Sequence, residues 1–148
     1  MKQFTSQRTI EAGIDEVFDV VAHIENFQKA LPHITNVEYL TEQRRGAGTR
    51  FRETRQMGKR EATTELEVRE YEPPNVVRMV SDAGGTVWDT TFRLTGTAAR
   101  TVLSMEMDAI PHKLPARLSL PLIGRVVAKA IETDMDAVKA YCEGSSES

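Results

Sequence analysis

The residues able to do acid–base or metal chemistry are few and widely spaced in this sequence. The three histidines, His23, His33 and His112, lack the short spacing, such as i and i+4, with which histidines share one metal ion. The single cysteine excludes an internal disulfide and a cysteine-rich zinc site. No GxSxG, P-loop or GxGxxG motif is present, and Gly46, Gly48, Gly84 and Gly85 fall in hairpin turns instead. We therefore expect no metal and no cofactor, and no motif requires an enzyme.

One carboxylate occupies an unusual position in a segment of alternating residues. If Phe51 faces the interior, the two-residue period of a strand turns Glu53 inward as well. A carboxylate on an apolar face costs free energy unless it is paired or protonated, so its presence needs a reason. The simpler alternative is that Glu53 lies at the rim of a sheet and pairs with an arginine such as Arg55. Thr64 and Thr90 also fall on apolar faces, where their hydroxyls could meet a ligand or bond only to nearby backbone.

Positive charge gathers in two places. The hairpin at residues 44–60 is rich in arginine, but glutamates interleave with the basic residues, and a solvated hairpin is expected there. The segment from Pro111 to Ile131 differs, because it contains no acidic residue and four cations: Lys113, Arg117, Arg125 and Lys129. Cations near the start of a helix oppose its dipole, so local stability does not explain them. An anionic ligand, an acidic partner or a membrane surface would, and incidental surface charge is the alternative.

Length and composition set further bounds. The chain has 148 residues, of which 40% are hydrophobic and 28% charged, as in one globular domain with a core or a core and a cavity. The balance of 19 basic and 22 acidic residues gives a net charge of −3, which argues against a general nucleic-acid binder. We find no signal-peptide apolar region and no run near the ~18 apolar residues of a membrane span, so a cytoplasmic protein is expected.

The elements that must position these residues include a long helix near the end of the chain. Pro121 suits its first turn and Gly144 its stop, and the tail at 144–148 is expected to be disordered. Apolar residues at helical spacing predict one continuous buried stripe: Leu122, Ile123, Val126, Val127, Ala130, Ile131, Met135, Val138 and Cys142. Cys142 is interpreted as a small buried hydrophobe. Upstream, Pro115 and Pro121 leave 116–120 too short for an independent helix, which predicts a mobile segment.

The remaining elements precede that helix. Residues 3–10 predict a strand, and Ile14 to Val21 and Ile24 to Leu31 predict two short helices, the second ended by Pro32. The period then switches to two, and six strands are expected in hairpin succession, at residues 34–40, 49–56, 62–69, 76–81, 88–94 and 103–108. One long helix cannot bury its apolar stripe alone. These strands must supply a broad concave surface for it, which makes the fold class α+β.

This order of elements resembles the helix-grip fold of the START-like (SRPBCC) superfamily. The superfamily includes polyketide cyclase/dehydrase-like proteins, coenzyme-Q-binding proteins and pollen-allergen-type carriers. VFDVVAHIENFQKALPHI (17–34) is similar to its first helix pair with the Leu-Pro step, GAGTRF (46–51) to its strand-opening glycine turn, and EVREYEPPNVV (67–77) to its fourth strand and proline turn. The resemblance implies one ligand-binding domain over residues 1–143. In it, a curved antiparallel sheet of about seven strands wraps the long C-terminal helix, with two short helices after strand 1.

The resemblance also implies an apolar cavity between the sheet and the long helix. The residues expected to contact a ligand there lie on inward strand faces, beside the Leu-Pro step and along the helix: Phe27, Leu31, His33, Phe51, Glu53, Thr64, Trp88, Thr90, Phe92, Met105, Met107, Leu118, Ile123 and Val127. Aromatic and methionine side chains make adaptable apolar walls. The alternative is that they complete a solid core. For His33, a structural or solvent-exposed role is the alternative to acid–base chemistry.

Carriers, enzymes and regulators share this scaffold, so the fold does not decide the function. We expect binding or transport of a hydrophobic or amphipathic molecule, lipid-, polyketide- or quinone-like. The first alternative is an enzyme of the polyketide cyclase/dehydrase type, and the second is a protein-interaction module. Lys113, Arg117 and Arg125 are expected to form a basic lip over the cavity, available for transient contact with a membrane surface. No nucleic-acid partner is expected, and the resemblance specifies neither the ligand nor the oligomeric state.

Overall fold

The computed structural model describes residues 1–146, and it confirms the order of elements expected from the sequence. The elements are β1 (Lys2–Ile10), α1 (Ile14–Ala22), α2 (Ile24–Ala30), β2 (Ile34–Tyr39), β3 (Arg50–Met57), β4 (Arg60–Glu72), β5 (Val76–Ala83), β6 (Thr86–Gly96), β7 (Thr101–Pro111) and α3 (Leu114–Ser146). Each strand from β4 to β7 is longer than its predicted segment.

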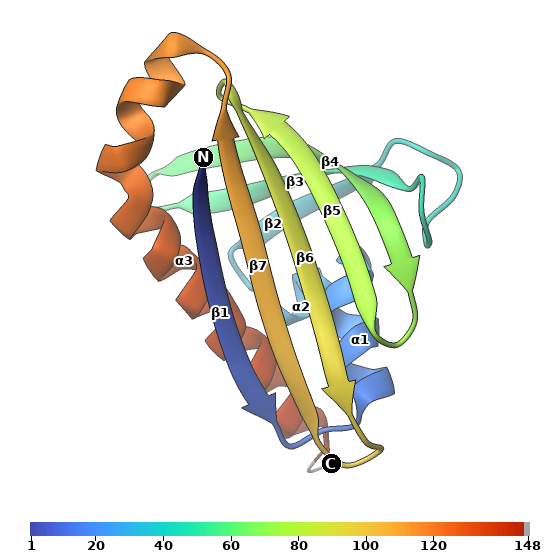
Figure 1. Cartoon of the computed structure of the whole chain (residues 1–148). Coiled ribbons are helices and arrows are strands. Elements are labelled where there is room, and N and C mark those ends of the chain that lie inside the picture. Colours follow the sequence, from blue (N-terminus) through green and yellow to red (C-terminus); the bar gives the residue numbers. More distant parts are fainter. Residues whose placement is uncertain (147–148) are drawn as a thin grey trace.

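All seven strands form one antiparallel sheet in the order β1-β7-β6-β5-β4-β3-β2. Strands β2 to β7 follow one another as antiparallel neighbours, and the last of them, β7, pairs with the first strand of the chain, β1. Figure 1 shows the sheet curving away from β1 toward β2, with α3 crossing its concave side. The α+β helix-grip architecture implied by the sequence is therefore confirmed.

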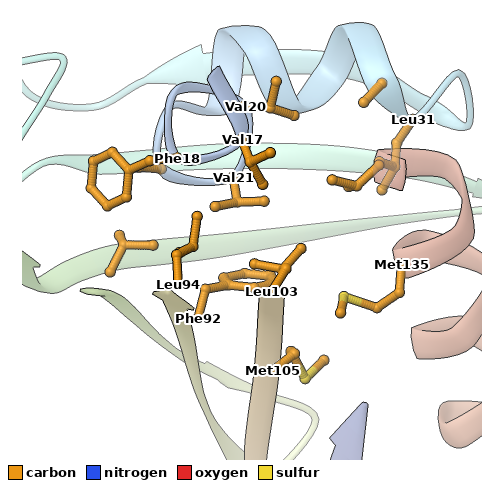
Figure 2. Close-up of a cluster of buried hydrophobic side chains, with 14 of the residues drawn as sticks. Val17, Phe18, Val20, Val21, Leu31, Phe92, Leu94, Leu103, Met105 and Met135 are labelled. Carbon is orange, nitrogen blue, oxygen red and sulfur yellow. The ribbon is translucent and has the colours of Figure 1, made fainter. Parts of the chain in front are cut away.

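The main core lies where α1 and the concave face of β6 and β7 meet. Strand alternation turns Leu94 and Leu103 inward, and the two residues are cross-strand partners. Both are buried, as are Val17 and Val21 on the facing side of α1. Figure 2 shows these side chains together, with Met135 of α3 approaching from the side. This end of the sheet is filled solidly with side chains.

A glycine allows the start of α1 to approach the turn between β6 and β7 closely. A Cβ atom at Gly13 would lie 2.6 Å from the carbonyl oxygen of Ala98, so only glycine fits this close approach. The next residue, Ile14, donates its backbone N–H to the carbonyl of Thr97 at 2.9 Å. The β6–β7 turn therefore holds the N-terminus of α1, and with it the helix pair that covers this end of the sheet.

Helix α3 differs from the prediction at both ends. It begins at Leu114 and contains Pro121 internally, so the expected interruption over residues 116–120 is wrong. Proline removes only one helical hydrogen bond, and burial of Ala116 and Leu120 stabilises this segment as helix. Figure 1 shows the helix bending in this first, orange part. Gly144 does not end the helix, which continues to Ser146; residues 147–148 of the predicted tail lie outside the described residues.

The two halves of α3 are buried to different degrees. Ile131, Met135, Val138 and Cys142 are buried, with Val138 only 1% exposed. In the first half, Leu122 is 82% exposed and Ile123 and Val126 are exposed as well. The prediction of one continuous buried stripe is therefore wrong for the first half. In the described part of the chain, no helix is long and apolar enough to cross a membrane.

Candidate functional site

A cavity of about 340 Å³ lies between the concave face of the sheet and the middle of α3. This volume falls at the lower end of the ~300–1,000 Å³ that small-molecule sites occupy. Side chains of α1, α2, β3–β7 and α3 line it, and most of them are apolar. The alternative of a solid core is therefore correct only for the end of the sheet under α1. Toward the first half of α3, the interior is hollow.

The strand register explains how the aromatic and methionine side chains come together. Thr90 pairs with Met107 and Phe92 pairs with Met105 across β6 and β7, so all four side chains share the concave face. Trp88 continues the same face of β6, opposite the small side chain of Ala109. Its indole Nε1–H donates to the carbonyl of Ala83 at 3.4 Å. The indole is thus oriented along one wall, with its polar edge turned to the backbone.

The structure brings most of the predicted ligand residues to this cavity: Phe27, Phe51, Glu53, Thr64, Trp88, Thr90, Phe92, Met105, Met107 and Val127. That they contact a ligand stays a prediction. The other predicted residues lie elsewhere. Leu31 is fully buried in the core, and His33 lies outside the lining. Leu118 and Ile123 are exposed on α3, whereas their neighbours Ala116 and Leu120 are buried.

Several residues beyond those predicted from the sequence line the cavity. Arg55 and Met57 continue the two-residue period that begins at Phe51 and Glu53, so strand alternation alone could have placed them. Asp134 lies seven residues after Val127 on the same side of α3, which is a helical repeat. The remaining lining residues are small or aliphatic: Val21, Ile24, Leu66, Met79, Ser81, Ala83, Val126, Ala130 and Ile131.

The polar part of the cavity wall is a cluster of ionic side chains that joins β3 to α3. Arg55 donates from Nε to Glu53 Oε1 at 2.9 Å and from Nη1 to Asp134 Oδ2 at 2.8 Å. Glu53 therefore faces the cavity and also pairs with Arg55, which combines both sequence-based expectations. The second oxygen of Asp134 lies 3.1 Å from His33 Nε2. This histidine thus borders the cavity through Asp134.

The electrostatics of this cluster follow from its charge count. Burial works to lower the pKa of the Arg55 guanidinium, but the carboxylates of Glu53 and Asp134 outweigh burial and raise that pKa above its ordinary value. One guanidinium serves two carboxylates, so the cluster is negative unless His33 is protonated. His33 Nε2 also lies 3.5 Å from Arg55 Nη1, so the imidazole meets a carboxylate and a guanidinium at one nitrogen. An imidazole beside a carboxylate is an arrangement able to move protons. In the described part of the chain, no group of three or more His, Cys, Asp or Glu residues is placed to hold a metal ion.

Comparison with known proteins places these features in a family. The model of the family described as "Polyketide cyclase / dehydrase and lipid transport" matches residues 1–143. A comparison with curated protein sequences gave no match.

Solved structures give the same fold at low sequence identity. A START superfamily protein from Mycobacterium smegmatis superposes with a TM-score of 0.79 at 13% identity, covering 96% of this chain and 97% of its own. The protein TTHA0849 from Thermus thermophilus gives 0.78 at 16% identity, covering 98% and 99%. The Zhui aromatase/cyclase from Streptomyces gives 0.76 at 18% identity, covering 96% and 93%. At these identities, the likeness concerns the fold alone.

Proposed function

Because the chain belongs to the polyketide cyclase/dehydrase and lipid transport family, we propose that it binds a hydrophobic or amphipathic small molecule between its sheet and α3. The observation that carries the proposal is the apolar cavity of about 340 Å³ in the middle of an otherwise filled interior. A void with apolar walls forfeits packing contacts, which a ligand of matching shape would restore. The proposed role is binding or transport, and cyclase activity is its alternative.

The walls favour a flat or flexible ligand with at least one polar group that donates hydrogen bonds. Trp88 and Phe92 offer aromatic faces, and Met105 and Met107 adapt to irregular shapes. The ionic cluster lies at the edge of the same space, and its carboxylates accept hydrogen bonds. Arg55 is already shared by Glu53 and Asp134, so a hydroxyl or phenol fits there better than another carboxylate.

The test measures how tightly an environment-sensitive apolar dye binds to the wild type and to two matched variants of α3. Val127→Phe fills the cavity, whereas Leu122→Phe adds the same kind of ring on the exposed side of the helix. We expect the dye to bind the wild type and to change the emission of Trp88, the single tryptophan. Val127→Phe should weaken dye binding at least tenfold, and Leu122→Phe should leave it unchanged. Absence of dye binding, or equal losses in both variants, would refute a ligand cavity.

Native mass spectrometry of freshly purified protein detects a co-purified ligand and gives its mass. A co-purified apolar molecule should be absent from Val127→Phe and present in Leu122→Phe. If the ligand returns from prolonged incubation with its mass and its chromatographic retention unchanged, the protein is a carrier, whereas a changed retention at the same mass means ring closure without loss of water. If the ligand returns with water lost, the protein acts as a cyclase or dehydrase.

The cyclase alternative has one specific observation in its favour, the His33–Asp134 pair beside the cavity. In an aldol cyclisation, a base removes a proton from a carbon next to a carbonyl, the carbanion attacks a second carbonyl, and an acid protonates the new alkoxide. The ligand mass falls only in the dehydration that follows, when a base removes a second proton from the same carbon and the protonated hydroxyl leaves as water. His33 could serve either proton transfer. His33→Asn should then abolish the change in ligand mass while dye affinity stays within about twofold of the wild type. A mass change that persists in this variant excludes His33 as the acid–base group.

A further inference from the structure

The first half of α3 carries an apolar surface on the side that faces away from the protein. Leu114, Leu118, Leu122 and Val126 follow one another at intervals of four residues, so they lie along one side of the helix. Each is more than 60% exposed, whereas Ala116 and Leu120, on the opposite side, are buried. We call the four exposed residues the outer stripe. Contiguous apolar surface of this kind marks interaction sites, because water contact with it is unfavourable.

Cations surround the outer stripe. Lys113, Arg117, Arg125 and Lys129 are all exposed, and within the described part of the chain none of them forms an ion pair. The first acidic residues that follow them, Glu132, Asp134 and Asp136, are held by Arg8 or Arg55. The segment therefore presents unneutralised positive charge on both sides of an apolar row.

Helix stability does not account for this charge. The first turn of α3 contains no acidic residue, although acidic groups there would favour the helix dipole. Lys113 and Arg117 sit at the first turn of the helix, where the dipole opposes them. An external negative surface is the partner that their positions suit.

We propose that the outer stripe docks on an anionic lipid bilayer. An amphipathic helix lies in the membrane interface when its apolar side is flanked by Lys and Arg, because leucines enter the acyl boundary and cations meet lipid phosphates. A second copy of the chain is a poorer occupant, since pairing two outer stripes would bring Arg125 and Lys129 of both copies together. Docking uses only α3 and needs no ligand in the cavity.

The outer stripe continues into the cavity. Val126 is both a member of the stripe and part of the cavity lining, and Met57, at the end of β3, is exposed and lines the cavity as well. A bilayer against the stripe would therefore face the side of the cavity that Val126 and Met57 border. A ligand could pass between membrane and cavity with little exposure to water. This last step rests on the proposed function, whereas docking does not.

The test is flotation of the full chain with vesicles of phosphatidylcholine, with and without phosphatidylglycerol. We expect binding to the anionic vesicles only, weakening as salt screens the charges. Arg125→Gln with Lys129→Gln should lower the partition coefficient about 25-fold, since each cation near an anionic surface contributes about fivefold. Leu118→Ser with Leu122→Ser should abolish binding, and both leucines are exposed enough to be replaced without unfolding.

The matched control removes two cations at the other end of the molecule. Arg93→Gln with Arg100→Gln changes exposed residues of β6 and the β6–β7 turn, which Figure 1 places far from the first turns of α3. This control should bind as the wild type does. Docking is overturned if no vesicle binds, if the α3 variants bind as well as the control, or if polyglutamate binds and vesicles do not. A leucine-dependent dimer in sedimentation would overturn it in favour of self-association. Vesicle binding by a protein whose cavity binds no dye would leave docking intact and count against the proposed function.

Discussion

The two halves of α3 carry the same kind of apolar spacing and end in opposite environments. Met135 and Val138 are buried in the second half, while Leu118 and Leu122 point into solvent in the first. A helical period reports which residues share a side of a helix, and it carries no information about what covers that side. The partner surface decides, and in the first half it covers only the side that carries Ala116 and Leu120.

The second half is held by neighbours on both sides. Helix α3 as a whole contacts β1, β7 and the two short helices, and Ile131, Met135, Val138 and Cys142 of its second half are buried in the core. Polar contacts add to this packing: Arg8 of β1 pairs with Glu132 and Asp136, and Lys139 donates to the carbonyl of Thr9. In the first half, Ala116 and Leu120 are buried against the protein body, Val126 and Val127 border the cavity, and the outer stripe meets solvent. One continuous helix thus combines a structural segment with a segment free to contact ligand or partner.

The largest expected effect separates the two halves by stability. Val138→Asp places a carboxylate in the filled core and should cost about 5 kcal/mol or abolish folding, because apolar packing surrounds the charge. Leu122→Asp, on the exposed half, should change the free energy of unfolding by less than about 0.5 kcal/mol. Urea denaturation of both variants measures the difference. Comparable losses would show that both halves are buried in solution.

Most of the fold could be predicted because its signals are local. The switch from helical to two-residue period after Pro32, and glycine or proline turns between strands, specify the order of elements. The start of α3 was mispredicted for a tertiary reason. Pro115 and Pro121 disfavour a helix locally, but Ala116 and Leu120 are buried against the protein body and stabilise it. Local propensity therefore gave way to packing.

The candidate site was predictable on the strands and less so on the helix. Once Phe51 and Trp88 face inward, alternation places Glu53, Thr90 and Phe92 with them. Strand alternation has no counterpart that could pair Asp134 with Arg55, because their sequence separation is 79 residues. Only the fold brings them together. A charged residue on a helix also looks like surface until the opposing strand is known.

The next prediction concerns the boundary between the halves, where Arg55 tethers β3 to Asp134. Arg55→Met leaves the buried carboxylate of Glu53 and that of Asp134 without their cation, which should cost about 3–5 kcal/mol. The matched control is Arg52→Met on the outer face of the same strand. Arg52 and its partners Glu38 and Glu65 are exposed, so this change should cost about 0–1 kcal/mol. Thermal unfolding compares the two, and equal costs would mean that the inner pair is as hydrated as the outer one.

The smallest effect is a pH dependence that only the buried half of α3 should show. Burial raises the pKa of the Cys142 thiol from 9.0 to about 12. Between these values, the unfolded chain has lost the thiol proton while the folded chain keeps it. The folded state therefore binds more protons, and stability falls as pH rises above about 9. One proton corresponds to about 1.4 kcal/mol per pH unit once the unfolded thiol is ionised.

Two variants test whether this slope belongs to the buried half. Cys142→Ala should lower stability at neutral pH but flatten its decline above about pH 9. Cys142→Ala combined with Leu122→Cys moves the thiol to the exposed half, where water solvates the thiolate in both states, so the slope should stay flat. Tyr39, whose pKa burial and its hydrogen bond to Glu25 raise from 10.0 to about 12, adds the same decline to every variant and cancels in the comparison. Parallel stability curves for wild type and Cys142→Ala between about pH 9 and 10 would mean that the second half of α3 admits water to its thiol, and the contrast between the halves would fail at Cys142.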